Sequence, residues 1–317
     1  MRRRAQGAEP LEGGRCSFRT WAPQARNLSV VLASGRSVEL AGDDNGYFGA
    51  VVDGVRPGST YRYVIDGGEP LPDPASRAQP GGVHGPSAVV DSSSFPWTDD
   101  GWAGMPLQDY IIMEAHVGTF TPEGTFDAMI AHLDDMHDLG ITALEVMPIA
   151  QFPGARNWGY DGVFPYAAQN TYGGPEGLMR LVDACHARGI AFILDVVYNH
   201  LGPEGNRLGD FGPYFTELYR TPWGAAMNVD GPYSDEVRRF FIDNALMWLE
   251  DFHVDALRLD AVHGIFDMSA YPFLRQLGDV VHERARDAGR PFHLIAESDS
   301  SDPRIVTPSE DNGIGMD

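Results

Sequence analysis

The amino-terminal part of the chain alternates apolar and polar residues, which is the pattern of strands with one buried face. Clusters of turn-forming residues at 43–46 and 53–58 separate these segments. Short strands at this spacing, without a helical period, predict a small immunoglobulin-like all-β sandwich over residues 11–91, preceded by a tail of residues 1–10. The strands we expect are 16–21, 28–32, 47–52 and 60–65.

The pattern changes after residues 92–108, a segment rich in Ser, Asp, Gly and Trp that we interpret as a domain linker. Beyond it, short apolar segments alternate with longer segments of helical period. Apolar strands that are each followed by a helix predict a parallel sheet covered on both faces. The expected strands are 110–114, 143–147, 191–197, 256–260 and 293–297, and the expected helices are 125–139, 175–188, 234–251 and 272–288.

Carboxylates lie at or near the ends of four of these strands, at Glu114, Asp195, Asp260 and Glu297. Because the chemistry of a TIM-type (β/α)8 barrel takes place at its carboxyl strand ends, the pattern favours such a barrel over residues 109–317. Five strands are counted where a complete barrel has eight. A doubly wound open sheet is the alternative, although no Gly-rich phosphate turn follows the first strand.

Composition and charge exclude several classes of protein. The 317 residues include 45 Asp and Glu against 23 basic residues, all of them Arg, for a net charge of −22. Such a chain repels nucleic acid and anionic membranes, so a neutral or cationic partner fits better, although the charge is equally compatible with a simple solubility trait. Cys16 and Cys185 are far apart and in no metal-binding spacing.

Targeting signals are also missing from the pattern. The basic residues 2–4 are not followed by the apolar segment of a signal peptide, and no apolar run approaches the length of a membrane span. We therefore expect a soluble, cytoplasmic protein that does not bind nucleic acid or membranes and that needs no metal.

The sharpest chemical feature is the segment 256–263, in which Arg258 and Asp260 share one face of a predicted strand. A neighbouring guanidinium keeps a carboxylate ionised at neutral pH, as a nucleophile at an anomeric carbon must be. Glu297 ends an apolar strand, where we expect desolvation to keep it protonated and to suit it to general acid catalysis. These are the two carboxylates that glycoside hydrolysis requires, and a structural ion pair is the alternative for Arg258 and Asp260.

Three ordered motifs carry a family resemblance. DVVYNH at 195–200, LRLD at 257–260 and AES at 296–298 resemble three of the four conserved strand-end motifs of the α-amylase superfamily of glycoside hydrolases. Within it, RNWGYDG at 156–162, DAVHG at 260–264 and AESD at 296–299 are similar to the malto-oligosyltrehalose trehalohydrolase family. The resemblance covers nearly everything from residue 16 onward.

The resemblance implies roles for individual residues. Asp260 would be the nucleophile of a retaining double displacement, Glu297 the general acid/base and Arg258 the support of the nucleophile. The implied reaction is hydrolysis of the α-1,4 bond next to the terminal trehalose of malto-oligosyltrehalose, without a cofactor. Asp195 and Asn199 would brace the strand ends, and Glu145 would be an interior carboxylate. The implied sugar-binding residues are Trp158, Tyr160, Asp161, His200 and His263.

One departure from the family pattern concerns the fourth motif, which supplies a third catalytic Asp and has no match here. Residues 109–317 are also fewer than the roughly 250 of a complete barrel. We therefore expect the sequence to be the amino-terminal part of a longer coding sequence. Two alternatives stay open: a glycogen branching or debranching enzyme of the same superfamily, and an inactive fragment that only binds α-glucan.

Overall fold

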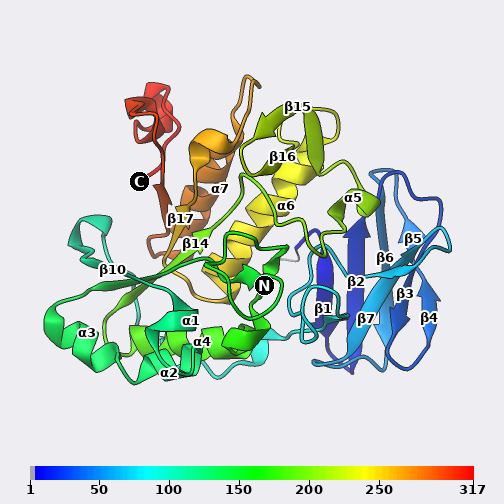
Figure 1. Ribbon diagram of the computed structural model, residues 1–317, viewed down its shortest axis with the longest axis horizontal. Coiled ribbons are helices and arrows are strands. Elements are labelled where there is room, and N and C mark those ends of the chain that lie inside the picture. The colour runs from blue at the N-terminus through cyan, green and yellow to red at the C-terminus, as the bar shows by residue number, and fades with distance from the viewer. Residues whose placement is uncertain (1–3) are drawn as a thin grey trace.

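The computed structural model describes residues 4–317, which form a β-sandwich and an α/β domain packed side by side (Figure 1). The two sheets of the sandwich are antiparallel, in the strand orders β1-β2-β6-β5 and β4-β3-β7-β8, with β9 beside β7. Their bounds are Gly7–Leu11 (β1), Arg15–Trp21 (β2), Leu28–Leu32 (β3), Ser37–Glu39 (β4), Ala41–Gly42 (β5), Tyr47–Asp53 (β6), Thr60–Ile65 (β7), Pro70–Leu71 (β8) and Ser87–Ala88 (β9). The sandwich and its four longer predicted strands are confirmed, because alternation gives each strand one face to bury.

The predicted tail is wrong where β1 forms, and its residues 1–3 lie outside the described part of the chain. β1 pairs with β2 in antiparallel register, from Gly7 opposite Arg19 to Leu11 opposite Arg15. Pro10 obscured the strand in the sequence, but an edge strand tolerates proline because one of its sides needs no ladder. Arg4, which is only 6% exposed, donates to the Leu246 carbonyl at 2.9 Å.

A five-stranded parallel sheet forms the core of the second part, in the order β10-β11-β14-β17-β18. The order follows the chain without the reversal that a doubly wound sheet has at its switch point. Helices cover the sheet, as Figure 1 shows for α4, α6 and α7. The strand bounds are Ile112–Ala115 (β10), Ala143–Val146 (β11), Ala191–Val196 (β14), Ala256–Leu259 (β17) and His293–Ala296 (β18).

The helices agree with the predicted ones except where they are interrupted. The helix expected at 125–139 is two, because the chain turns at Ala131 and His132, and the one expected at 234–251 ends in a π-helical turn, Met247–Asp251 (η4). The helix bounds are Val117–Phe120 (α1), Phe126–Ile130 (α2), Leu133–Leu139 (α3), Gly174–His186 (α4), Leu208–Phe211 (α5), Ser234–Leu246 (α6) and Phe273–Ala288 (α7).

Two hairpins interrupt segments that the sequence predicts as loops. One, Ala150–Gln151 (β12) with Phe164–Ala168 (β13), follows β11, and the other, Phe215–Thr221 (β15) with Gly224–Met227 (β16), lies between β14 and α6. The linker 92–108 contains short 3-10 turns, Ser92–Ser94 (η1) and Leu107–Asp109 (η2), and further 3-10 turns are Asn170–Tyr172 (η3), Val262–Gly264 (η5), Pro303–Ile305 (η6) and Ser309–Asp311 (η7).

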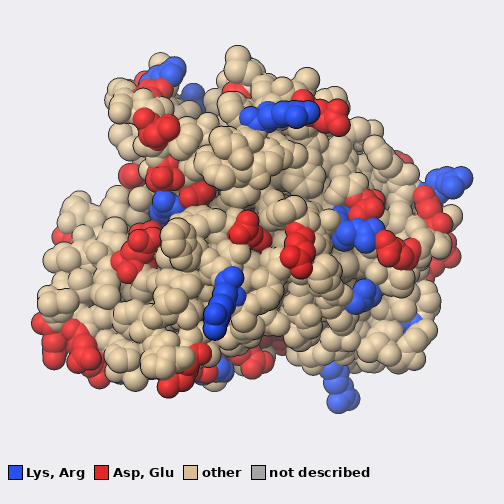
Figure 2. Space-filling view, viewed as in Figure 1, with Lys and Arg blue, Asp and Glu red and all other residues tan. Residues whose placement is uncertain are grey.

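Acidic side chains are spread over both parts of the molecule and gather at the corner formed by α2 and α3 (Figure 2). Arginines lie between them and pair with several, as Arg180 does with Asp127 at 2.7 Å. Among residues 4–317, no helix is long and apolar enough to cross a membrane.

Candidate active site

The carboxyl ends of β14, β17 and β18 bring the predicted catalytic residues together. Parallel pairing places Asp195 of β14 opposite Arg258 of β17, and Leu259 opposite Ala296 of β18. Asp260 and Glu297 therefore follow directly on neighbouring strands. As predicted from the two-residue period, Leu257 is buried on the opposite face from Arg258.

Arg258 is the centre of the cluster. Its Nη1 atom donates to Asp195 Oδ2 and to Asp260 Oδ1, both at 2.9 Å, and its Nη2 atom lies 3.4 Å from Glu297 Oε2. One guanidinium thus contacts both of the predicted catalytic carboxylates. A bridging cation of this kind offsets the repulsion between two carboxylates in a small volume.

Each of the two predicted catalytic carboxylates has a second hydrogen-bond partner. Asn199 Nδ2 donates to the side chain of Asp260 at 2.9 Å and to its carbonyl at 2.8 Å. The backbone N–H of Ala261 donates to Glu297 Oε2 at 2.6 Å. Ala261 has φ of 42°, in the left-handed region, which costs a non-glycine residue conformational energy.

Burial shifts the pKa values of two groups next to Arg258, namely Asp195 and Tyr160. It raises the pKa of Asp195 to about 7, against the pull of the Arg258 guanidinium, and Asp195 Oδ1 has no hydrogen-bond partner among residues 4–317. Burial also raises the pKa of Tyr160, whose hydroxyl donates to Asp195 Oδ2 at 3.1 Å.

The expected desolvation of Glu297 is wrong for this structure, because its side chain is 47% exposed. Its contacts here are the N–H of Ala261 and the guanidinium of Arg258, which hold the carboxylate in place.

The predicted histidines lie around an aromatic residue that the sequence did not single out. Trp223, at the turn of the β15–β16 hairpin, stacks on His200 at 5.7 Å between ring centroids and meets the edge of His263 at 6.2 Å. His200 Nδ1 lies 2.5 Å from Asn199 Oδ1, and burial lowers its pKa. No local motif marks Trp223, since only the folded hairpin brings it to the site.

The remaining predicted sugar contacts lie on the loop before β13. Asp161 accepts a hydrogen bond from Asn157 Nδ2 at 2.7 Å, so the loop holds its own carboxylate in place. Trp158 is 70% exposed and lines a hollow of about 540 Å³ with His116 and Arg156. Of these three residues, Tyr160 is the one whose side chain contacts a member of the Arg258 cluster, because its hydroxyl donates to Asp195.

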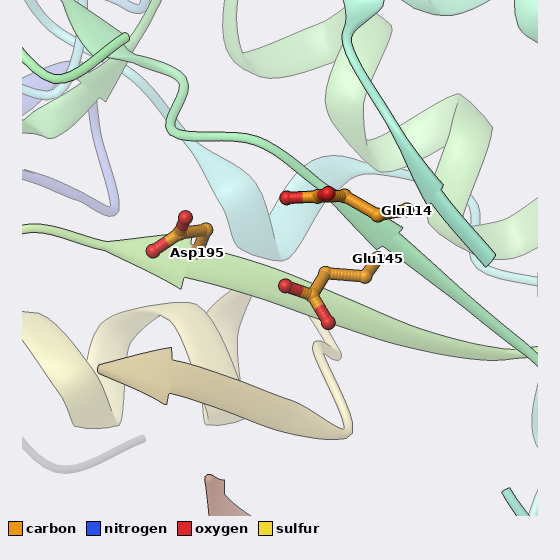
Figure 3. Close-up of side chains that lie close together, drawn as sticks. All are labelled: Glu114, Glu145 and Asp195. Carbon is orange, nitrogen blue, oxygen red and sulfur yellow. The ribbon is translucent and has the colours of Figure 1, made fainter. Parts of the chain in front are cut away.

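Three carboxylates from neighbouring strands are the described residues whose spacing could hold a metal ion. Glu114 and Glu145 extend toward Asp195, and one oxygen of each of the three lies within 4.8 Å of the others (Figure 3). Burial and the Glu114 carboxylate raise the pKa of Glu145. Protonation relieves the repulsion in such a group without any cation, so the cluster by itself indicates no metal.

Comparison with known families defines the class of protein. Residues 89–210 match the catalytic domain of alpha amylase, and residues 6–78 match carbohydrate-binding module 48, the isoamylase N-terminal domain. The order of the two agrees with a β-sandwich followed by a parallel α/β domain.

Within that class the chain is similar to malto-oligosyltrehalose trehalohydrolases. It is 48% identical to that of Saccharolobus solfataricus over 301 residues and 49% identical to that of Arthrobacter ramosus over 303 residues, in each case over 95% of this chain. The family resemblance predicted from the motifs is confirmed. A 1,4-alpha-glucan branching enzyme of Corynebacterium jeikeium is 29% identical over 352 residues.

A solved structure agrees with this assignment. The crystal structure of a candidate alpha amylase of Salmonella typhimurium superposes with a TM-score of 0.87 and 42% identity, over 93% of this chain and 50% of that one. The chain spans about half the length of the curated relatives it matches, 52% and 53% for the two named above.

Proposed function

We propose that the chain carries the nucleophile and the general acid/base of a retaining glycoside hydrolase that releases trehalose from malto-oligosyltrehalose. The observation that supports this most directly is the Arg258 guanidinium, which contacts the carboxylates of both Asp260 and Glu297. The similarity to trehalohydrolases at 48–49% identity, against 29% for the branching enzyme, supports the choice of substrate.

The proposed reaction has two displacements. Asp260 attacks the anomeric carbon of the glucosyl unit while Glu297 gives its proton to the glycosidic oxygen, so that trehalose leaves and a glycosyl–Asp260 ester forms. Glu297 then takes a proton from water, whose oxygen attacks the same carbon and frees Asp260. Arg258 and Asn199 hold the Asp260 carboxylate oriented for the attack.

The sugar would be held by the side chains around this pair. We propose that the Tyr160 ring covers the apolar face of the glucosyl unit, since its hydroxyl is fixed on Asp195. His200, His263 and Asp161 would bind sugar hydroxyls, and Trp158 would contact the outer part of the glucan. Trp223 adds an aromatic wall beside the two histidines.

We further propose that the five parallel strands are the first five of a (β/α)8 barrel and that the sandwich is of the immunoglobulin-like type. Sequential strand order and covering helices support the barrel. The domain limits 11–91, 92–108 and 109–317 stay a proposal, with β1 added to the sandwich.

The test is trehalose release from malto-oligosyltrehalose, with maltopentaose as the comparison substrate. We expect Asp260→Asn to abolish release and Glu297→Gln to lower it by ~10²–10⁴-fold, the usual contribution of a general acid. Glu310→Gln, which alters an exposed carboxylate of η7, is the matched control and should not change the rate.

Three outcomes contradict parts of this proposal. Unchanged release by Asp260→Asn removes the nucleophile assignment, and branched or shortened products from maltopentaose favour a branching or debranching enzyme. Binding of malto-oligosaccharides without any hydrolysis by residues 1–317 favours the interpretation of this chain as a glucan-binding protein.

A further inference from the structure

The aromatic side chains of the sandwich are all withdrawn from solvent. Residues 4–91 contain six Phe, Trp and Tyr residues, and each is at most 8% exposed: Phe18, Trp21, Tyr47, Phe48, Tyr61 and Tyr63. An exposed ring that covers the apolar face of a pyranose is a common feature of a surface that binds a glucan chain. Within the described residues, the sandwich offers no such ring.

Several of these rings are instead directed at one segment of the α/β domain. Trp21 meets the edge of Tyr214 at 5.4 Å, and Tyr63 meets the edge of Phe211 at 6.1 Å. The Tyr47 hydroxyl is hydrogen-bonded to the carboxylate of Glu236. The contacts all fall on residues 204–236, which include the excursion of the chain between β14 and α6.

The backbone of that excursion lies against the sandwich without room for a side chain. A Cβ atom on Gly212 would lie 2.9 Å from the Trp21 ring, and one on Gly205 would lie 2.7 Å from Val83. Polar contacts reinforce this interface. Tyr214 donates to Gln6 Oε1 at 3.1 Å, Arg207 pairs with Glu69 at 2.6 Å, and His84 lies 3.4 Å from Glu204.

The β15–β16 hairpin, in the later half of the excursion, reaches the proposed sugar site. The β15–β16 hairpin places Trp223 against His200 and His263, and a Cβ atom on Gly264 would lie 2.9 Å from the Trp223 ring. Gly264 and His263 follow Asp260 closely in the chain. Trp223 is 45% exposed, so one part of its ring is packed and another is open to a ligand.

We propose that the sandwich is a brace for the excursion 201–233 and thereby positions Trp223 at the sugar site, and that it is not itself a surface for glucan binding. A hairpin held from both ends loses little conformational entropy when a sugar binds, which is the advantage of such a brace. The proposal rests on the proposed function only for the statement that Trp223 contacts sugar. The statement that the sandwich holds the excursion rests on the contacts that residues 204–214 make with the sandwich.

The test is amide hydrogen exchange along residues 1–317 in the variant Gly212→Ala. Gly212 has an extended backbone, with φ of −173°, so any residue can adopt its conformation. The added Cβ would press mainly on the buried Trp21 ring, at 2.9 Å, and less on Pro23 Cδ, at 3.3 Å. We expect exchange at 215–227 to become roughly five- to hundredfold faster, the factor that overpacking of a buried contact corresponds to. Exchange at 143–146 and 191–196, in the centre of the parallel sheet, should stay unchanged.

Two further variants separate a brace from general destabilisation. The pair Trp21→Phe with Gly212→Ala removes the ring atoms that clash and should restore slow exchange at 215–227. Val51→Ala, on the 51% exposed side chain of β6, is the matched control and should leave the hairpin unaffected. If Gly212→Ala loosens 204–214 but leaves 215–227 unchanged, the brace is overturned, because the hairpin is then held without the sandwich.

A second measurement adds saturating maltoheptaose to the unaltered chain. Under the proposal, protection increases at 199–200 and 215–227 and does not change at 15–65. Protection of the sandwich strands overturns the statement that they bind no glucan. Loss of the expected protection at the site counts against the proposed function, while the brace is decided by the Gly212→Ala exchange alone.

Discussion

At the scale of single residues, the site includes a third carboxyl group, Asp195, that has no proton-transfer or nucleophilic role in the proposed reaction. Asp195 lies opposite Arg258 in the strand register, and it shares the Nη1 atom of Arg258 with Asp260. When Asp195 is neutral, the guanidinium charge acts on Asp260 and Glu297 alone. When Asp195 ionises, a third negative charge enters the cluster. Burial makes that charge costly, which is why the pKa of Asp195 is raised to about 7.

We therefore expect the free energy of unfolding to depend on Asp195 between about pH 4 and pH 7. A carboxyl group whose folded pKa is raised stabilises the fold fully below its ordinary pKa and loses that contribution as pH rises to the folded pKa. Denaturant titrations across this range should show a steeper loss of stability with rising pH in the unaltered protein than in Asp195→Asn. Asp44→Asn, in an exposed sandwich turn, is the control, and equal pH slopes for Asp195→Asn and the unaltered protein would refute the expectation.

At the scale of elements, the linker 92–108 is held to the α/β domain by a buried ionic cluster. His186, at the end of α4, lies 2.8 Å from Asp99 and 2.9 Å from Asp255. Trp102 stacks on its ring at 4.8 Å and donates to Asp255 Oδ1 at 2.7 Å. The segment that composition marks as a linker is therefore packed against the α/β domain at Asp99 and Trp102.

The charge of His186 sets the pH range of this docking. Burial opposes the charge, but hydrogen bonds to Asp255 and Asp99 outweigh it and raise the pKa of His186, while His186 and His253 lower the pKa of Asp99 to about 2. The cluster also contains Arg290, which donates to Asp255 Oδ1 at 3.2 Å. The His186 contribution is therefore complete below its ordinary pKa and is lost as pH rises through the raised value.

We expect His186→Ala to lower the free energy of unfolding by about 1–3 kcal/mol, because it removes a hydrogen-bond partner shared by two buried carboxylates, which keep Arg290 and His253 as their other partners. Amide exchange at 97–105 should be faster in this variant, and in the unaltered protein it should become faster on the alkaline side. His84→Ala, at an exposed surface pair, is the matched control. Unchanged exchange at 97–105 in His186→Ala would show that the linker is held by other contacts.

At the scale of the whole molecule, the parallel sheet has an open edge at β10. Ile111 and Ile112 are 57% and 43% exposed there. The opposite edge, at β18, is partly covered, since Asp317 donates its N–H to the Leu294 carbonyl at 2.9 Å. An exposed apolar edge strand is a template for pairing with another chain.

We expect residues 1–317 to self-associate through this edge as concentration rises, and Ile112→Lys to weaken the association several-fold. Sedimentation velocity over a concentration series measures the effect. Val51→Lys is the matched control, because Val51 is similarly exposed, at 51%, but lies on β6 of the sandwich, away from the edge of the parallel sheet. Equal association of the unaltered chain and Ile112→Lys would place the contact elsewhere.

Much of the fold and the core of the site could be predicted from sequence because their signals are local. Alternation marked β2, β3, β6 and β7, and apolar segments followed by helical periods marked the five parallel strands. Arg258 and Asp260 share a face because they are two residues apart, and Glu297 ends its strand, so their chemistry follows from short stretches of sequence. β1 escaped because Pro10 weakens the strand signal, and β15–β16 because its segment resembles a loop.

Only the tertiary structure decided which distant groups meet. The contact of Asp195 with Arg258 follows from the register of β14 on β17, and a register cannot be read from either strand alone. The exposure of Glu297 depends on what covers its strand end, and the place of Trp223 depends on a hairpin that we propose is held by a separate domain. The order of residues along the chain sets which chemical groups stand at the strand ends, whereas long-range packing decides their partners, their solvation and therefore their protonation.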